Sequence, residues 1–217
     1  MQRRAFSLSA ASAAAVAMGA ALPQAALAQT AFKEGKDFLA LEKRAPTESS
    51  AGQVEVVEFF WYSCPHCNAF EPQLEGWVKK LPADVSFRRV PVAFRDDFVP
   101  QQRLFYTLEA MGKVDDLHRK VFNAIHVDKQ PTAKEDQILA WAEKNGLDKA
   151  KFKEVYNSFS VQAKARKASQ LQEAFQVEGV PALGVAGRWY TDGSMAGNMP
   201  RALQVTEYLL AEARKSR

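Results

Sequence analysis

The stretch VVEFFWYSCPHCNAFEP, Val56 to Pro72, decides how this chain of 217 residues is interpreted, because it contains both of its cysteines, Cys64 and Cys67. A structural disulfide ties distant segments of a chain together. Closing a loop as short as the one between Cys64 and Cys67 restricts the unfolded chain very little. The pair therefore has to be explained by its chemistry and by the segments on either side of it.

The segments around the cysteines predict a strand followed by a helix and a second strand. QVEVVEFFWY, residues 53–62, is rich in Val and Phe and is typical of a buried, central strand. Residues 68–81 place apolar side chains at helical spacing, and DVSFRRVPVAF, residues 84–94, predicts the second strand. The cysteines are then expected at the turn from the first strand to the helix.

The remainder of the chain predicts a helical block, a hairpin and a final helix. Helical patterns cover residues 101–111, 115–125, 134–144, 151–159 and 161–175. VPALGVAGRWYTDG, residues 180–193, predicts two short strands that turn at Ala186-Gly187, and an amphipathic helix follows. This order of elements predicts an α/β sheet domain with a helical insertion.

The first 28 residues have the pattern of an export signal. Arg3 and Arg4 form a basic start, and an uncharged run rich in Ala and Val follows. ALA, residues 26–28, supplies the small residues of a cleavage site, so we expect cleavage after Ala28 by either the Sec or the twin-arginine route. Export leads to an oxidising compartment, where disulfides form and persist.

Composition is typical of a single globular domain. Removing 28 residues leaves 217 − 28 = 189, enough for one domain with an insertion. The signal contains two Arg and no acidic residue, so 29 − 2 = 27 Lys and Arg remain against 25 Asp and Glu. A net charge of +2 gives no reason to expect a nucleic-acid partner.

A metal site is the first alternative for the Cys-x-x-Cys spacing. A closed zinc site needs four ligands, and only His66, His118 and His126 are available beside the cysteines, without a matching motif. Haem attachment needs His directly after the second cysteine, where this chain has Asn68. We expect no metal and no organic cofactor, and we interpret His118 and His126 as ordinary structural residues. A copper-carrying dithiol stays open as an alternative, because soft thiolates suit Cu(I).

The spacing favours a redox-active pair. With Cys64 as the N-cap and Pro65 as the first helical residue, Cys67 lies one helical turn further on, close enough for a disulfide to form and break. A thiolate on Cys64 faces the unpaired N–H groups of the first turn, and His66 adds to its stabilisation. We therefore expect Cys64 to be the exposed sulfur that is attacked and Cys67, inside the helix, to be the resolving one.

EFFWYSCPHC, residues 58–67, together with GVPAL, residues 179–183, resembles the DsbA family of periplasmic thiol:disulfide oxidoreductases. The resemblance covers essentially the whole mature chain and implies a thioredoxin fold with an inserted helical domain. It implies a discontinuous thioredoxin-like domain at residues 29–96 and 166–217, with the helical insertion at 97–165. A low cysteine pKa and an oxidising couple are known properties of DsbA proteins, so this trend belongs to what the resemblance implies.

The resemblance also implies roles for residues outside the cysteine pair. The peptide bond that matches Val180–Pro181 is cis in the family and lies beside the disulfide, where it leaves backbone groups for an extended substrate. Glu58 matches a buried acid near the resolving cysteine. On this hypothesis Glu58 exchanges a proton with Cys67, whereas a carboxylate at the edge of the sheet is the alternative.

We expect a monomeric periplasmic dithiol oxidase, which donates the Cys64–Cys67 disulfide to newly exported proteins through a mixed disulfide at Cys64. The resemblance implies that a membrane quinone reductase of the DsbB type then reoxidises the pair. Only residues 29–52 of the mature chain precede the first strand, too few for the N-terminal dimerisation domain of an isomerase. A periplasmic dithiol reductase or isomerase remains an alternative, and a copper carrier without enzyme activity is the less favoured one.

Overall fold

The strand that precedes the cysteines, β2 (Val54–Phe60), lies inside a five-stranded sheet in the computed structural model. The structure describes residues 32–216, and the expected signal peptide, residues 1–28, lies outside the described residues. All seven residues of β2 are buried, as expected for a strand with a neighbour on each side. The strand order is β1-β5-β4-β2-β3, so the prediction of a central strand is confirmed.

The pairing of β2 brings distant segments to the cysteine end of the sheet. β3 (Val85–Pro91) pairs with β2 in parallel, and β4 (Ala182–Val185) pairs with its other edge in antiparallel orientation. Phe59 lies opposite Ala182. β4 therefore begins where β2 leads into the cysteines.

The predicted hairpin is formed by β4 and β5 (Trp189–Asp192). Ala186 and Gly187 between these strands both have positive φ, 54° and 64°. A side chain at position 187 is also excluded by space, because an added Cβ would lie 2.3 Å from the carbonyl oxygen of Ala45. A short strand β1 (Leu39–Ala40), absent from the prediction, pairs with the outer edge of β5.

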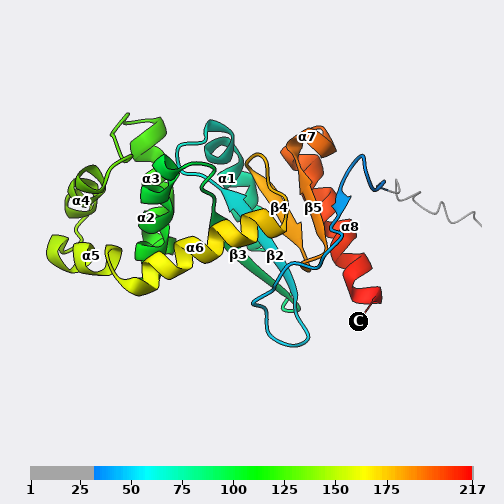
Figure 1. The fold of residues 1–217 in the computed structure, drawn as a ribbon. Helices are drawn as coiled ribbons and strands as arrows, with labels where there is room; N and C mark the ends of the chain where they lie inside the picture. Colours follow the sequence, from blue (N-terminus) through cyan, green and yellow to red (C-terminus); the bar gives the residue numbers. More distant parts are fainter. Residues whose placement is uncertain (1–31, 217) are drawn as a thin grey trace, which may run out of the picture. The chain divides into compact units, whose positions relative to one another are not determined.

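Two helices, α1 (Pro65–Val78) and α8 (Met199–Lys215), cover one face of the sheet (Figure 1). Their apolar side chains pack on inward residues of β2 and β4, among them Val56 and Leu183. Burying apolar side chains of this size stabilises the fold by roughly 1.5–3 kcal/mol each. This layer fixes α1 against the sheet and so fixes the position of its first turn.

The predicted helical block lies between β3 and β4. It consists of a 3-10 turn, η1 (Asp96–Phe98), and the helices α2 (Val99–Ala110), α3 (Val114–His126), α4 (Glu135–Lys144), α5 (Lys149–Tyr156) and α6 (Phe159–Ala174). All five helices were predicted, with ends displaced by up to three residues. A short helix that follows β5, α7 (Gly193–Ala196), was not predicted.

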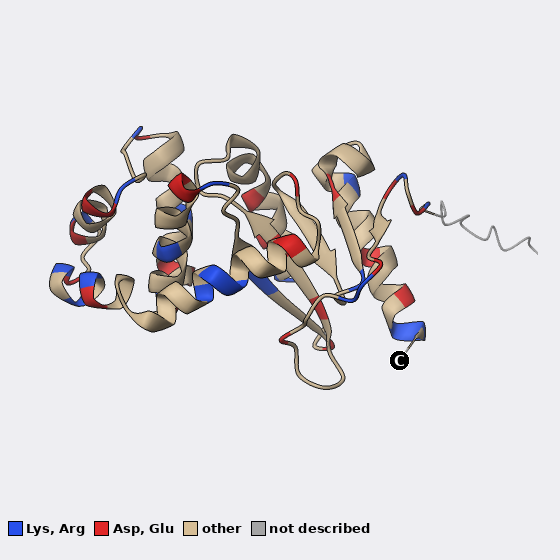
Figure 2. Ribbon diagram, viewed as in Figure 1, with Lys and Arg blue, Asp and Glu red and all other residues tan. Residues whose placement is uncertain are grey.

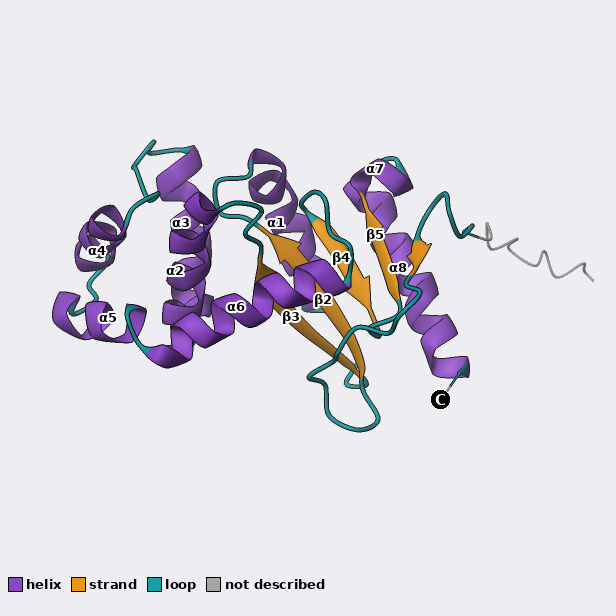
Figure 3. Cartoon of the chain, viewed as in Figure 1, coloured by secondary structure: helices purple, strands orange, loops and turns teal. Residues whose placement is uncertain are grey.

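Helix α6 connects the helical block to the sheet. In Figures 1 and 3 it runs from the block back across the sheet. Phe175, directly after α6, packs on Phe59 of β2 with the ring centroids 5.3 Å apart. The end of α6 thus covers the sheet face opposite α1.

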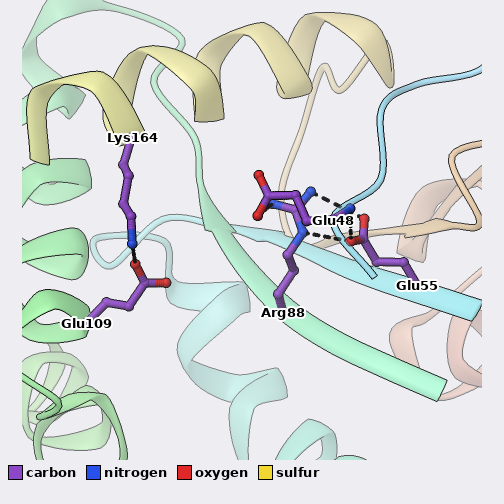
Figure 4. Close-up of polar contacts among 5 residues, drawn as sticks. All are labelled: Glu48, Glu55, Arg88, Glu109 and Lys164. Carbon is purple, nitrogen blue, oxygen red and sulfur yellow. Dashed lines mark hydrogen bonds and ion pairs between the residues drawn. The ribbon is translucent and has the colours of Figure 1, made fainter. Parts of the chain in front are cut away.

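Two groups of ion pairs lie on this side of the sheet (Figure 4). Arg88 of β3 contacts the buried Glu55 of β2, with Nε 3.1 Å from Oε1, and the exposed Glu48 of the preceding loop at 3.8 Å. Lys164 of α6 pairs with Glu109 of α2. Exposed pairs contribute little to stability, whereas a buried carboxylate needs its partner. The main effect of Arg88 is therefore to neutralise Glu55.

Charges of both signs are mixed on the outer helices. Lys and Asp or Glu occur together on α4 and α5 (Figure 2). This mixture agrees with the nearly balanced charge of the mature chain. Within residues 32–216, no helix combines the length and the hydrophobicity that a membrane crossing requires.

The close contact between β4 and Phe175 leads to a test of the packing. An added Cβ on Gly184 would lie 2.4 Å from Cε1 of the Phe175 ring. We expect Gly184→Ala to lower the free energy of unfolding by about 1–3 kcal/mol, because the buried ring has to shift. Gly76→Ala in α1 is the control, since space is open there and Ala favours a helix by up to about 1 kcal/mol. Urea unfolding measures both, and an unchanged midpoint for Gly184→Ala contradicts the packing.

Candidate active site

The turn from β2 to α1 makes Cys64 the N-cap of α1, as predicted. Cys64 has an extended backbone (φ −78°, ψ 118°), and Pro65 is the first helical residue. The backbone N–H of Cys67 donates a hydrogen bond to Sγ of Cys64 at 3.3 Å. The first turn of a helix leaves backbone N–H groups without a partner inside the helix, and the N–H of Cys67 is one of them. It donates to the sulfur of Cys64 instead. Both cysteines are free thiols in this structure.

The two sulfurs lie in different environments. The side-chain hydrogen bond with Cys67, and then the backbone N–H groups of Cys67 and His66, lower the pKa of Cys64 to about 6 against the effect of burial. Burial raises the pKa of Cys67 well above its ordinary value, and the adjacent Cys64 raises it further. Cys64 is only 7% exposed, less than expected, but Cys67 is 0% exposed. Of the pair, solvent reaches Cys64 alone.

The Val180–Pro181 bond lies next to this turn, as the resemblance implied. The bond is cis. The thiol of Cys64 donates a hydrogen bond to the carbonyl oxygen of Val180 at 3.4 Å, although 116 positions separate the two residues. Pro65 and His66, between the cysteines, are both exposed. A partner that approaches Cys64 therefore meets the backbone of Val180 at the same place.

Glu58 is buried and lies on the central strand β2, so it is not a carboxylate at the sheet edge. Its Oε2 is 3.2 Å from Nε of Arg89 on β3, and Arg89 also pairs with Glu71 of α1. Burial, and after it the negative charge of Glu71, raise the pKa of Glu58 to about 8 against the attraction of Arg89. The charge of Glu58 in turn contributes to the high pKa of Cys67. Glu58 and Cys67 are thus electrostatically coupled.

His118 and Tyr62 extend this buried ionic group. Nε2 of His118 is 3.5 Å from Oε2 of Glu71, and Nδ1 is 2.9 Å from the hydroxyl oxygen of Tyr62. His118 was interpreted as an ordinary structural residue, and the structure places it in contact with the group that contains Glu58. The sequence signal that points to this group is the pair Arg88-Arg89 in an otherwise mostly apolar strand, because a buried charge requires a partner.

The helical insertion holds the loop before Cys64 through two side chains, Gln101 and His126, for which this contact was not predicted. Gln101 of α2 accepts a hydrogen bond from the N–H of Ser63 at 3.2 Å and donates one to its hydroxyl at 2.7 Å. Nε2 of His126 lies 2.8 Å from the carbonyl oxygen of Tyr62. No local motif marks Gln101, because its partner is 38 positions away.

The cysteine pair lies outside the cavity of about 630 Å³ that α2, α6, β3 and the loop before β2 enclose. Arg88, Lys164 and Tyr106 line that cavity, and residues 64–67 do not. Among residues 32–216, no three His, Cys, Asp or Glu side chains are grouped as ligands for a metal ion. The thiols therefore lie at the turn before α1, outside that cavity.

The chain is similar to known thiol:disulfide interchange proteins over most of its length. Residues 55–204 match the family model of the DSBA-like thioredoxin domain. The thiol:disulfide interchange protein DsbA of Burkholderia cepacia is 41% identical over 199 residues, which are 90% of this chain and 91% of that protein. The protein of the same name from Bordetella parapertussis is 46% identical over 165 residues, 76% of this chain and 78% of its own length.

Solved structures share the fold. The crystal structure of Pseudomonas aeruginosa DsbA matches with a TM-score of 0.81 at 39% identity, covering 85% of this chain and 96% of that one. The oxidoreductase NmDsbA1 from Neisseria meningitidis matches with a TM-score of 0.73 at 26% identity, covering 85% and 95%. These similarities confirm the predicted thioredoxin fold with inserted helices. The chain belongs to the DsbA-like thioredoxin family.

Proposed function

We propose that this chain is a periplasmic protein dithiol oxidase, which donates the Cys64–Cys67 disulfide to exported proteins through a mixed disulfide at Cys64. The observation that carries the proposal is the hydrogen bond from the Cys67 N–H to Sγ of Cys64, which favours a thiolate at the helix start. A stabilised thiolate favours the reduced pair, so the disulfide passes to other thiols, and DsbA proteins are themselves known examples of this behaviour. The relatives named thiol:disulfide interchange proteins support the same chemistry.

The reaction has two exchange steps. A substrate thiolate attacks Sγ of Cys64, the Cys64–Cys67 bond breaks, and Cys67 leaves as a thiolate. A second substrate thiolate then attacks the substrate sulfur of the mixed disulfide, and Cys64 leaves as a thiolate. The substrate loses two electrons and gains a disulfide, while the enzyme pair is reduced.

Glu58 has the properties of the proton partner of Cys67. The thiolate that Cys67 becomes in the first step is buried, and burial raises its pKa, so it takes up a proton. Glu58 is protonated near neutral pH because its pKa is raised to about 8. Glu58 therefore donates a proton when Cys67 leaves, and its carboxylate accepts one when Cys67 attacks during reoxidation.

The backbone at Val180 and Pro181 provides the substrate contact in this proposal. The Val180 carbonyl oxygen lies 3.4 Å from Sγ of Cys64. An extended substrate segment bound to Cys64 places its own N–H groups within reach of that oxygen, as in strand addition. Binding through backbone atoms suits an enzyme whose clients differ in sequence.

The cellular setting is part of the same proposal. The signal pattern over residues 1–28 supports cleavage after Ala28 and a periplasmic location. We propose reoxidation by a membrane quinone reductase of the DsbB type and action as a monomer. The proposed division into residues 29–96 with 166–217, and 97–165, is supported by the position of α2 to α5 between β3 and β4, although α6 runs across its second boundary.

The equilibrium of the cysteine pair with glutathione tests the direction of the reaction. We expect the pair to be much more oxidising than thioredoxin, whose potential is about −270 mV. His66→Ala is expected to make the pair less oxidising, but only in part, because the charge of His66 is lost while the backbone donors of α1 remain. A wild-type pair as reducing as thioredoxin supports a reductase instead and overturns the proposal.

Thiolate absorbance of the reduced protein tests which sulfur is the nucleophile. We expect one thiolate per chain to form with a pKa of about 6, because the helix start stabilises Cys64. The second thiol, Cys67, is expected to ionise far above this value because it is buried. Cys64→Ser removes the first step and is the control. A first step at or above the ordinary cysteine value of about 8.5 contradicts the mechanism.

The lowered pKa of Cys64 predicts how stability depends on pH. Its folded value, about 6, lies below the unfolded value of about 8.5, so its contribution is fully present above the unfolded pKa and is lost as pH falls through the folded one. We expect the reduced protein to melt above the oxidised one near neutral pH, with a difference that shrinks as pH falls towards 6. Cys67, whose pKa is raised, costs stability only above the unfolded value. Thermal unfolding of both forms across pH measures this, and a difference independent of pH argues against it.

A further inference from the structure

His118 has a polar contact at each ring nitrogen within an otherwise aromatic environment. Three phenylalanine rings lie around it at centroid distances of 5.2–6.0 Å, those of Phe60, Phe105 and Phe122. Nδ1 lies 2.9 Å from the hydroxyl oxygen of Tyr62, and Nε2 lies 3.5 Å from Oε2 of Glu71. Packing alone does not require a carboxylate at a buried ring nitrogen, so His118 calls for an electrostatic explanation.

Glu71 and Arg89 connect His118 with Glu58. Glu71 contacts His118 through Oε2 and Arg89 through Oε1. Arg89 contacts Glu58 through Nε at 3.2 Å. The side chains of Glu58 and Glu71 are 0% exposed, that of His118 is 5% exposed, and that of Arg89 is 16% exposed. The four side chains form one ionic group that is largely removed from solvent.

The charges of this group do not balance without one proton. Two carboxylates and one permanent cation, Arg89, leave a net charge of −1, and burying an uncompensated charge is costly. One proton on Glu58, Glu71 or His118 restores neutrality. Glu71 is the least suitable place, because the contacts with His118 and Arg89 hold its pKa below the usual value in spite of burial. Glu58 and His118 are the two remaining places.

We propose that Glu58 and His118 compete for one labile proton that exchanges with solvent, because their charges are coupled across Glu71 and Arg89, and that His118 is thereby a positioning residue for proton exchange at Cys67. The inference deepens the proposed function and rests on it. When Glu58 gives its proton to the Cys67 thiolate, His118, whose side chain is 5% exposed, takes up a proton from solvent and restores the neutrality of the group. When Cys67 is to attack, a proton held on His118 leaves Glu58 ionised and ready to accept.

Tyr62 makes both states of the imidazole possible. Its hydroxyl donates to Nδ1 when His118 is neutral, and the same oxygen accepts from Nδ1–H when His118 is protonated. Burial raises the pKa of Tyr62 well above its ordinary value, so the hydroxyl keeps its proton in both states. Nδ1 of His118 therefore has a hydrogen-bond partner in both states, while Nε2 faces Oε2 of Glu71 at 3.5 Å.

The other charges that act on His118 are few. Burial lowers the pKa of His118, Glu71 of α1 acts in the opposite direction, Arg89 of β3 lowers it, and Glu75 of α1 raises it. The elements α2 and α3 contribute the rings of Phe105 and Phe122 to its surroundings. Glu71 and Arg89 act on both His118 and Glu58, so these two residues link the charge states of the two sites.

Nuclear magnetic resonance titration of the oxidised full mature protein tests this competition. Two sites that compete for a proton each titrate in two steps that belong to the pair. We expect the Glu58 carboxyl carbon and the His118 ring nitrogens to show the same two steps in the wild type. His118→Gln should remove the acidic step of Glu58, and Glu58→Gln should remove the alkaline step of His118, lowering its midpoint by about one pH unit or more.

The matched control is His126→Gln, which removes another histidine of α3 that contacts the backbone of Tyr62 and not Glu71. It should leave the Glu58 titration unchanged. A single-step Glu58 curve that is the same in wild type and His118→Gln overturns the proposal, as does a His118 curve unaffected by Glu58→Gln. Because the second measurement observes His118 itself, the test stands even where His118→Gln unfolds.

The rate of Cys67 attack on a Cys64–glutathione mixed disulfide supplies a functional readout. His118→Gln should move the pH profile of this step to higher pH, and a profile displaced by one pH unit lowers the rate below neutral pH roughly tenfold. A profile that stays in place while only the folded fraction falls indicates a structural role and contradicts the proposal. Failure of the proposed function appears separately, as a reducing equilibrium with glutathione in the wild type.

Discussion

The N–H group of Cys67 points at Sγ of Cys64 because Cys64 is the N-cap of α1. This contact makes the two sulfurs unequal, because it stabilises a thiolate on Cys64. The cap exists because β2 is held on both sides within the sheet and because Pro65 suits the first helical position, where no backbone donor is needed. Only one cysteine of the pair occupies the cap. The other lies one turn inside the helix, where its sulfur is removed from solvent.

Burial and the helix start therefore act in opposite directions on two thiols that are three positions apart. The helix donors favour charge on Cys64, and desolvation disfavours it on Cys67. A leaving thiolate at Cys67 is costly unless a proton arrives with it. The charge of the buried acid Glu58, which Arg89 neutralises in part, contributes to the raised pKa of Cys67, so the ionic group beneath α1 acts electrostatically on the cysteine pair.

The helical insertion is part of this site as well as a cover for the sheet. Gln101 of α2 binds the backbone and hydroxyl of Ser63, and His126 of α3 contacts the backbone of Tyr62. These contacts fix the loop that leads into Cys64. His118, also on α3, reaches the ionic group through Glu71 of α1. A thioredoxin sheet without the insertion would lack all three side chains.

Local order along the chain is enough to predict most of the helices and strands and the arrangement of the cysteine pair at a helix start. The buried strand, the helix start at Cys64-Pro65 and the hairpin at Ala186-Gly187 follow from residues close together in the chain. The short β1 escaped prediction because two residues carry no periodic pattern.

Tertiary structure alone decided which distant side chains meet. Arg89, Glu71 and His118 lie on a strand and two different helices, and their contact depends on register and packing angles that no local pattern contains. For the same reason, only the folded chain shows how deeply Cys64 is buried and which residue is the partner of each buried charge. Burial and pairing depend on residues that are distant in the sequence and become neighbours only when the chain folds.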